Sequence, residues 1–188
     1  MRIIGIDPGP TESAYALIDN DFRVHEAEKV NNDNLAEWLA VQRPVHVVIE
    51  SMQSYGAPVG RSTFETCFMI GRLIQVCKDH QIPYTLYPRP EYTRRICGVG
   101  KINDAVLRQA LLLRFGGYGE TATTEVIPTG QEGAGVYKGG PRKGQPRVRE
   151  VHTPQPLHAL NCTDKRSAYA VAVYHVDVTT HERRAVHA

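Results

Sequence analysis

A short apolar strand that ends in an acid is the feature that most constrains the fold. Residues 3–6 form a continuous apolar run, typical of a buried strand. Asp7 follows at once, and residues 8–10 (Pro-Gly-Pro) cannot continue a regular element. Alternation over 13–18 predicts a second strand that returns as a hairpin. Asp7 therefore lies at the end of a central strand, where α/β sheets hold their sites; the alternative is a turn cap, since aspartate is common before Pro-Gly.

The same pattern of strand and acid occurs again further along the chain. Residues 22–30 predict a third antiparallel strand, and the β-branched run 45–49 ends in Glu50. If the strands before Asp7 and Glu50 are neighbours, their carboxylates converge. Asp164, which begins a predicted helix over 164–175, adds a third acid. Such repelling carboxylates call for a divalent cation, and hard oxygen ligands favour Mg²⁺, with Mn²⁺ able to substitute.

Length and composition limit the class of protein. The chain has 188 residues, which is ample for one domain and short for two, so we expect a single domain over 1–188. Its 41% hydrophobic and 22% charged residues are typical of a soluble globular protein. No apolar run approaches the roughly 20 residues that span a bilayer, so no membrane partner is expected. The first strand begins too early to leave room for a signal peptide, which predicts a cytoplasmic protein.

The middle of the chain predicts further helices. Ser62 and Glu65 match a capping box for a helix over 62–78. This helix is apolar on two sides, one facing the sheet and one facing a second subunit of a homodimer, with Gly71 allowing close approach. A strand over 82–87, a short helix with Pro90 in its first turn, and a helix that starts at Asn103 or Asp104 follow. Residues 116–117 (Gly-Gly) end that last helix.

The stretch 118–158 is rich in glycine and proline and predicts a basic loop or insertion without regular structure. Within it, residues 138–149 contain no acid. They carry five basic side chains: Lys138, Arg142, Lys143, Arg147 and Arg149. This pattern is typical of a flexible arm laid along nucleic acid. The alternative is an ordinary disordered loop.

Other side chains near the predicted acidic edge are candidates for nucleic-acid binding. Arg94, Arg95 and Lys101 are positioned in the sequence to contact a phosphate, or else they form a solvated helix face. Tyr55, in the loop after Glu50, is a candidate to stack on an unpaired base. A half-buried structural tyrosine is equally compatible with its position.

These motifs together resemble those of a known family. Residues 5–10 (Gly-Ile-Asp-Pro-Gly-Pro) look like the opening motif of the RuvC-like Holliday junction resolvases, a branch of the RNase H-like nucleases. The resemblance continues in the same order through four more segments: 48–50 to the second acidic motif, 62–78 to the following helix, 96–101 to a Gly-x-Gly segment, and 164–172 to the last helix. It spans most of the chain outside 118–158.

The resemblance implies an RNase H-like α/β fold, with a mixed central sheet whose first three strands are antiparallel and with helices on both faces. It also implies a Mg²⁺-dependent endonuclease that acts as a homodimer on four-way DNA junctions. Asp7, Glu50 and Asp164 would be its catalytic, metal-binding carboxylates. The small size and divergent loop suggest a viral or mobile-element type, working in a bacterial cytoplasm or a virus's host cell.

The sequence departs from the family at two positions. The family usually carries a second aspartate three residues after the first on its last helix, where Ser167 stands here. Either water and the other acids complete the site, or another residue replaces the aspartate, or activity is reduced. Asp104 stands near the position of a family lysine, and Lys101 is the candidate to take that lysine's part.

Three alternative functions remain open. The first is a nuclease of the same fold that acts on RNA or R-loops. The second is a junction-binding protein whose catalysis is weakened or lost through Ser167. The third is a sugar-kinase or actin-like ATPase, against which the short length argues, because only one of the two characteristic halves is present.

Overall fold

The structure is a computed structural model, and it describes residues 2–42, 44–54, 56, 58–98, 102–117, 120–129, 131–138 and 140–186. The elements in chain order are β1 (Ile3–Asp7), β2 (Glu12–Ile18), β3 (Val24–Asn31), α1 (Asn32–Gln42), β4 (His46–Ser51), α2 (Arg61–Asp79), β5 (Tyr84–Pro88), α3 (Arg89–Cys97), α4 (Asp104–Phe115), β6 (Glu120–Val126), β7 (Val148–Pro154) and α5 (Thr163–Val186). Within these ranges, no helix is long and apolar enough to cross a membrane.

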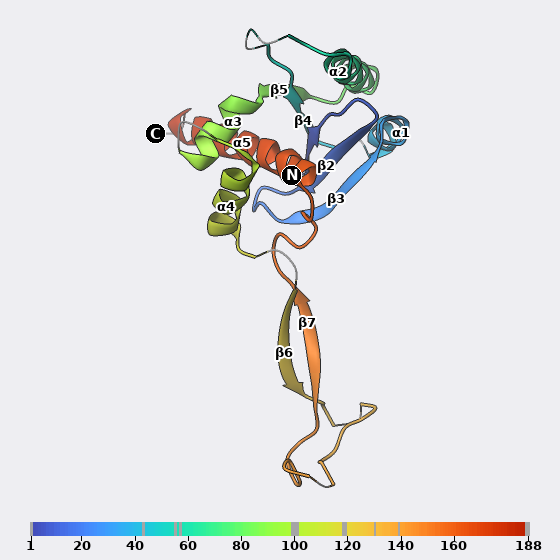
Figure 1. Ribbon diagram of the computed structural model, residues 1–188, viewed down its shortest axis with the longest axis vertical. Coiled ribbons are helices and arrows are strands. Elements are labelled where there is room, and N and C mark those ends of the chain that lie inside the picture. The colour runs from blue at the N-terminus through green and yellow to red at the C-terminus, as the bar shows by residue number, and fades with distance from the viewer. Residues whose placement is uncertain are drawn as a thin grey trace.

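Five strands form one mixed sheet in the order β3-β2-β1-β4-β5 (Figure 1). Strands β1, β2 and β3 pair antiparallel, as the sequence predicts. Strand β4 lies parallel to β1, with Ile49 opposite Ile6, and β5 continues the parallel half. The acids that follow Ile6 and Ile49, Asp7 and Glu50, therefore leave the sheet side by side at one edge.

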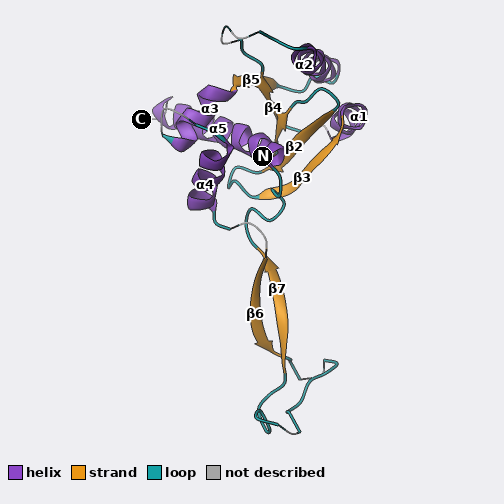
Figure 2. Cartoon of the chain, viewed as in Figure 1, coloured by secondary structure: helices purple, strands orange, loops and turns teal. Residues whose placement is uncertain are grey.

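Helices cover both faces of this sheet, which confirms the predicted fold class (Figure 2). On one face, Ile4 and Ile6 of β1 pack with the buried side chains of α1 and α2. On the other face, Ile3 packs with α3, α4 and the alanine- and valine-rich centre of α5. Because both faces are covered, β1 and β4 are continuous apolar runs rather than alternating ones.

The helix ends follow the predicted chemistry in one case and differ in another. Asn103 caps α4 by accepting a hydrogen bond from the Val106 amide at 3.0 Å. The predicted capping box at Ser62 is wrong, because α2 already begins at Arg61 and Gly60 is its N-cap. Glu65 instead pairs with Arg61 Nε at 2.7 Å on the helix surface.

The last helix is longer than the predicted 164–175, since α5 continues to Val186. Its second half is tied to α4 by a bidentate ion pair, in which both Nη atoms of Arg114 lie 2.7 Å from the carboxylate oxygens of Asp177. Two charge-assisted hydrogen bonds in this fork geometry stabilise the packing of α4 on α5.

The stretch 118–158 contains regular structure that the sequence does not predict. Strands β6 and β7 pair antiparallel from Glu120 opposite Pro154 to Val126 opposite Val148. The hairpin projects from the body of the molecule as a long arm, and the described residues of its tip (127–129, 131–138 and 140–147) are mostly irregular (Figure 1). Its sequence is rich in threonine, which favours strands through its branched Cβ but leaves no apolar run to recognise.

Candidate active site

The turn after β1 fixes the direction in which Asp7 leaves the sheet. The Gly9 amide donates to Ser13 Oγ at 3.2 Å, and Asn32 Nδ2 donates to the Gly9 carbonyl at 3.0 Å. Ser13 Oγ in turn donates to Asn32 Oδ1 at 2.6 Å, which closes the network. A Cβ on Gly9 would lie 2.3 Å from the Glu12 carbonyl oxygen, so the turn needs glycine there. Because Ser13 and Asn32 hold the turn, it does not depend on the Asp7 carboxylate.

Glu50 reaches the same edge from the neighbouring strand β4 and is mostly buried, with 12% of its side chain exposed. The hydroxyl of Tyr92, a fully buried residue of α3, donates to Glu50 Oε2 at 2.6 Å. This contact orients the carboxylate and satisfies the buried phenol.

Asp164 comes to the edge from the first turn of α5. The approach of α5 is very close, because a Cβ on Gly5 would lie 2.0 Å from the Ala168 carbonyl oxygen and 2.8 Å from Ala172 Cβ. Asp164 pairs with Lys29 of β3, whose Nζ lies 2.8 Å from Oδ2. A hollow lined by Asp7, Asp164, Lys29 and residues 8–12 opens here to solvent.

The acids are electrostatically coupled. Burial, together with the nearby charges of Glu50 and Asp164, raises the pKa of Asp7 to about 8. Arg89 and a hydrogen bond with Ser167 act in the opposite direction on the same carboxyl. Burial also raises the pKa of Glu50, against the opposing effects of Tyr92 and Arg89. Perturbed carboxyls of this kind mark a site where negative charge is held close together.

An arginine that the sequence does not single out lies within this cluster. Arg89 Nη1 lies 3.0 Å from Ser167 Oγ and 3.6 Å from Glu50 Oε2, and Nη2 forms an ion pair with Asp104. Its position could have been found from β5, because a residue just after a parallel strand next to β4 emerges at the same edge as Asp7 and Glu50.

The donor set has the chemistry for one hard divalent cation. Asp7, Glu50 and Asp164 supply carboxylate oxygens from three elements at one edge, and their mutual repulsion is what such an ion relieves. The described residues include no three His, Cys, Asp or Glu side chains that stand together closely enough to hold a metal ion. Lys29 holds Asp164, while Tyr92 and Arg89 hold Glu50. Binding an ion would therefore require Asp164 to leave Lys29.

The remaining predicted site residues lie in several places. Arg94 and Arg95 are exposed on α3, the helix that begins with Arg89. The five basic residues of 138–149 are all exposed on the arm, and Arg149 Nη1 donates to Gln131 at 3.1 Å. Tyr55 and Lys101 lie outside the described residues.

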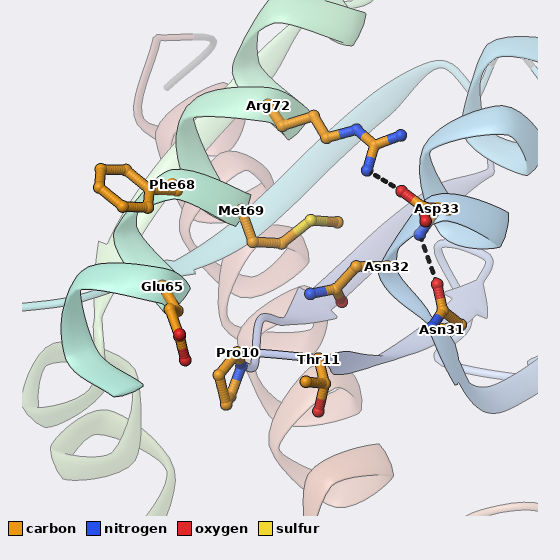
Figure 3. A pocket seen from close by; sticks show the side chains of 9 residues that line it. All are labelled: Pro10, Thr11, Asn31, Asn32, Asp33, Glu65, Phe68, Met69 and Arg72. Carbon is orange, nitrogen blue, oxygen red and sulfur yellow. Dashed lines mark hydrogen bonds and ion pairs between the residues drawn. The ribbon is translucent and has the colours of Figure 1, made fainter. Parts of the chain in front are cut away.

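A second hollow lies beside the first, between α1, α2 and the turn after β1 (Figure 3). Pro10 and Thr11 line both hollows. Arg72 of α2 forms an ion pair with Asp33 across it, as Figure 3 shows. Phe68 of α2, which lines this hollow, is 74% exposed, and Phe64 on the same helix is 53% exposed.

Comparison with known proteins identifies the fold. No protein-family model and no curated protein matches the sequence. Among solved structures, Thermus thermophilus RuvC is similar at 15% identity and a TM-score of 0.59, with 97% of each chain covered. The same protein in complex with a Holliday junction substrate gives 15% identity and a TM-score of 0.60, over 97% of this chain and 96% of that one. The yeast mitochondrial Holliday junction resolvase Ydc2 is similar at 14% identity and a TM-score of 0.54, over 97% of this chain and 82% of its own.

The likeness extends over 97% of this chain. Identities of 14–15% establish a shared architecture. The chain has the RNase H-like fold of the RuvC-type Holliday junction resolvases.

Proposed function

We propose that this protein is a Mg²⁺-dependent endonuclease that cleaves four-way DNA junctions. The observation that carries the proposal is that Asp7, Glu50 and Asp164 come from three elements to the same edge of an RNase H-like sheet, where the charges of Glu50 and Asp164 act on Asp7. The fold neighbours add support, since two of the similar structures are described as a Holliday junction resolvase or a complex with Holliday junction substrate. We infer the cytoplasm as the site of action.

In this proposal, Asp7, Glu50 and Asp164 hold the ion. A bound Mg²⁺ or Mn²⁺ would supply a more acidic water and would neutralise charge on the scissile phosphate. The turn held by Ser13 and Asn32 keeps Asp7 rigid. Tyr92 donates to Glu50 Oε2 at 2.6 Å, which fixes the orientation of that carboxylate. Such rigid placement lowers the cost of organising the reacting groups.

The arm and the basic side chains of α3 would hold the DNA. Five exposed cations on the arm, Lys138, Arg142, Lys143, Arg147 and Arg149, suit contacts to the phosphate backbone. Arg94, Arg95 and Lys101 would contact phosphates near the edge, and Tyr55 would stack on an unpaired base. Contacts of this kind read shape and charge more than sequence.

We also propose that the protein acts as a homodimer through α2. The outer face of this helix exposes Phe64, Cys67 and Phe68 next to Gly71, which has no side chain to hold a partner away. Exposed aromatic side chains grouped on one helix face favour a protein interface. A two-fold dimer would present two acidic sites to a junction whose arms have the same pseudo-symmetry.

The experiment compares substrates in Mg²⁺ and in Mn²⁺. Purified protein is incubated with a synthetic four-way junction, an RNA–DNA hybrid and a linear duplex of the same sequence. The proposal expects cleavage of the junction in preference to both others. Preferential cleavage of the hybrid would favour the RNA nuclease, and junction binding without cleavage would favour the non-catalytic alternative.

A further inference from the structure

We propose that Arg89 is a built-in cation that takes the place of a second divalent ion, so that each chain binds a single Mg²⁺ or Mn²⁺. The inference rests on the proposed function, in which the edge of the sheet that carries Asp7, Glu50 and Asp164 (the acidic edge) is a nuclease centre. It concerns the number of ions that this chain's own residues allow.

The contacts of Arg89 place its charge within the acidic edge. Its guanidinium spans three elements, since it reaches Glu50 of β4, Ser167 of α5 and Asp104 of α4. Asp7 also contributes to the electrostatic stabilisation of the guanidinium. A planar guanidinium suits this task because it donates several hydrogen bonds in fixed directions while carrying one charge.

Ser167 is the partner that makes this arrangement possible. The residue is fully buried, and its hydroxyl accepts from Arg89 Nη1 at 3.0 Å while also lowering the pKa of Asp7. A neutral hydroxyl can bridge a guanidinium and a carboxylate, whereas it offers a hard cation no charge. The Ser167 hydroxyl therefore suits contact with an arginine that lies between acidic side chains.

Repulsion by Arg89 works against a second ion. A divalent ion about 4 Å from the guanidinium would bind at least about 10-fold more weakly even with the dielectric constant of water, and more weakly still in a partly buried site. Burial opposes the charged form of Arg89, but the neighbouring negative groups outweigh it and hold its pKa above the usual value. Arg89 thus stays cationic.

The guanidinium is also accessible from outside. The Arg89 side chain is 37% exposed, so a phosphate that enters the edge can contact it. Guanidinium groups bind phosphate oxygens through charge-assisted hydrogen bonds. Arg89 is therefore placed both to balance the acids and to meet the negative charge of the DNA backbone.

The test counts Mn²⁺ bound per chain by equilibrium dialysis and by electron paramagnetic resonance, with the intact protein alone and on a four-way junction with non-hydrolysable linkages. Wild type should bind one ion. Arg89→Gln should still bind one, about 10-fold more tightly because a repelling charge is gone, yet it should cleave a normal junction at least 10-fold more slowly. The double variant Arg89→Gln with Ser167→Asp should bind two. Arg23→Gln, an exposed arginine at the opposite end of the sheet, should match wild type.

Three results would overturn the inference: no ion or two ions on wild type, unchanged or weaker Mn²⁺ affinity in Arg89→Gln, or a folded double variant that binds one ion. If the double variant does not fold, the affinity of Arg89→Gln decides alone. Ion counts do not require cleavage, so a protein that binds one ion and cuts no junction would refute the proposed function and leave this inference standing.

Discussion

Replacing Asp7 by asparagine should make the metal-free protein more stable at pH 8. The carboxyl has an ordinary pKa of 3.8, which the fold raises to about 8, chiefly through burial and then through Glu50 and Asp164. Between these two values, the folded chain keeps a proton that the unfolded chain has lost. The free energy of unfolding therefore falls as the pH rises from about 4 to about 8. An asparagine does not ionise and escapes this loss.

The magnitude follows from the linkage relation. Each pH unit costs about 1.4 kcal/mol while one extra proton is held by the folded state. Because the neighbouring acids share the titration and side chains relax, the loss should be smaller than this slope gives over the whole pH range. We expect the free energy of unfolding of wild type to fall by about 3 kcal/mol between pH 4 and pH 8. For a chain of this length, that corresponds to roughly 6–12 °C in melting temperature.

The assay is thermal unfolding in EDTA at several pH values from 4.5 to 8. Asp7→Asn should melt at about the same temperature as wild type at pH 4.5 and clearly higher at pH 8. Asp21→Asn, an exposed aspartate in the turn after β2, is the matched control and should show no such pH trend. Added Mg²⁺ at pH 8 should raise the melting temperature of wild type more than that of Asp7→Asn. A variant that is less stable than wild type at pH 8, or a difference that does not change with pH, would refute the reasoning.

Three further perturbations test other parts of the structure. Gly5→Ala should lower the free energy of unfolding by about 3 kcal/mol in urea titrations, because its Cβ would lie 2.0 Å from the Ala168 carbonyl oxygen; a loss below about 1 kcal/mol would contradict the close packing of α5 on β1. Phe68→Lys should convert a dimer to a monomer in analytical ultracentrifugation. The far-ultraviolet circular dichroism should not change, because the Phe68 side chain is 74% exposed and its replacement leaves the core intact. A dimer that persists would exclude this face of α2 as the dimer interface. Replacing residues 127–147 by Asn-Gly joins the paired Val126 and Val148 by a two-residue turn, and it should leave the melting temperature unchanged. The affinity for the junction should fall, and it should depend less on salt concentration. An unchanged salt dependence would show that the arm does not contact the DNA.

The acidic edge was largely predictable from the sequence because its main signals are local. Asp7 and Glu50 each follow a short apolar run, and parallel neighbours bring such residues to one edge. The antiparallel start of the sheet follows from the turn at residues 8–10 and the alternation after it. Whether Asp7, Glu50 and Asp164 hold a metal stays a prediction.

The place of Arg89 just after β5 could be read from local signals, but its contacts could not. It lies 78 residues before Ser167 in the sequence, and the contact exists only because β5 continues the parallel half of the sheet and α5 crosses it. The sequence directs attention to Arg94 and Arg95 on the same helix, but a helix places only some of its side chains toward a given edge. The Tyr92–Glu50 contact is non-local in the same way.

The arm was missed for a different reason. Hydrophobic periodicity reports strands that are buried on at least one face, and a hairpin outside the core has no such requirement. Threonine-rich β6 pairs with β7 through backbone hydrogen bonds, and its side chains carry no alternation to recognise. The glycine- and proline-rich tip between them then dominates the composition of the whole stretch.

The most direct test of the proposed function is cleavage of a synthetic four-way junction in Mg²⁺ by wild type and by Asp7→Asn. The products are mapped at nucleotide resolution on all four strands. We expect wild type to make paired, symmetric cuts in two opposing strands. Asp7→Asn should cut at least about 100-fold more slowly, while its affinity for the junction equals that of wild type. Equal cleavage by the two proteins, or degradation of linear duplex without cleavage of the junction, would contradict the assignment of this acidic edge to junction resolution.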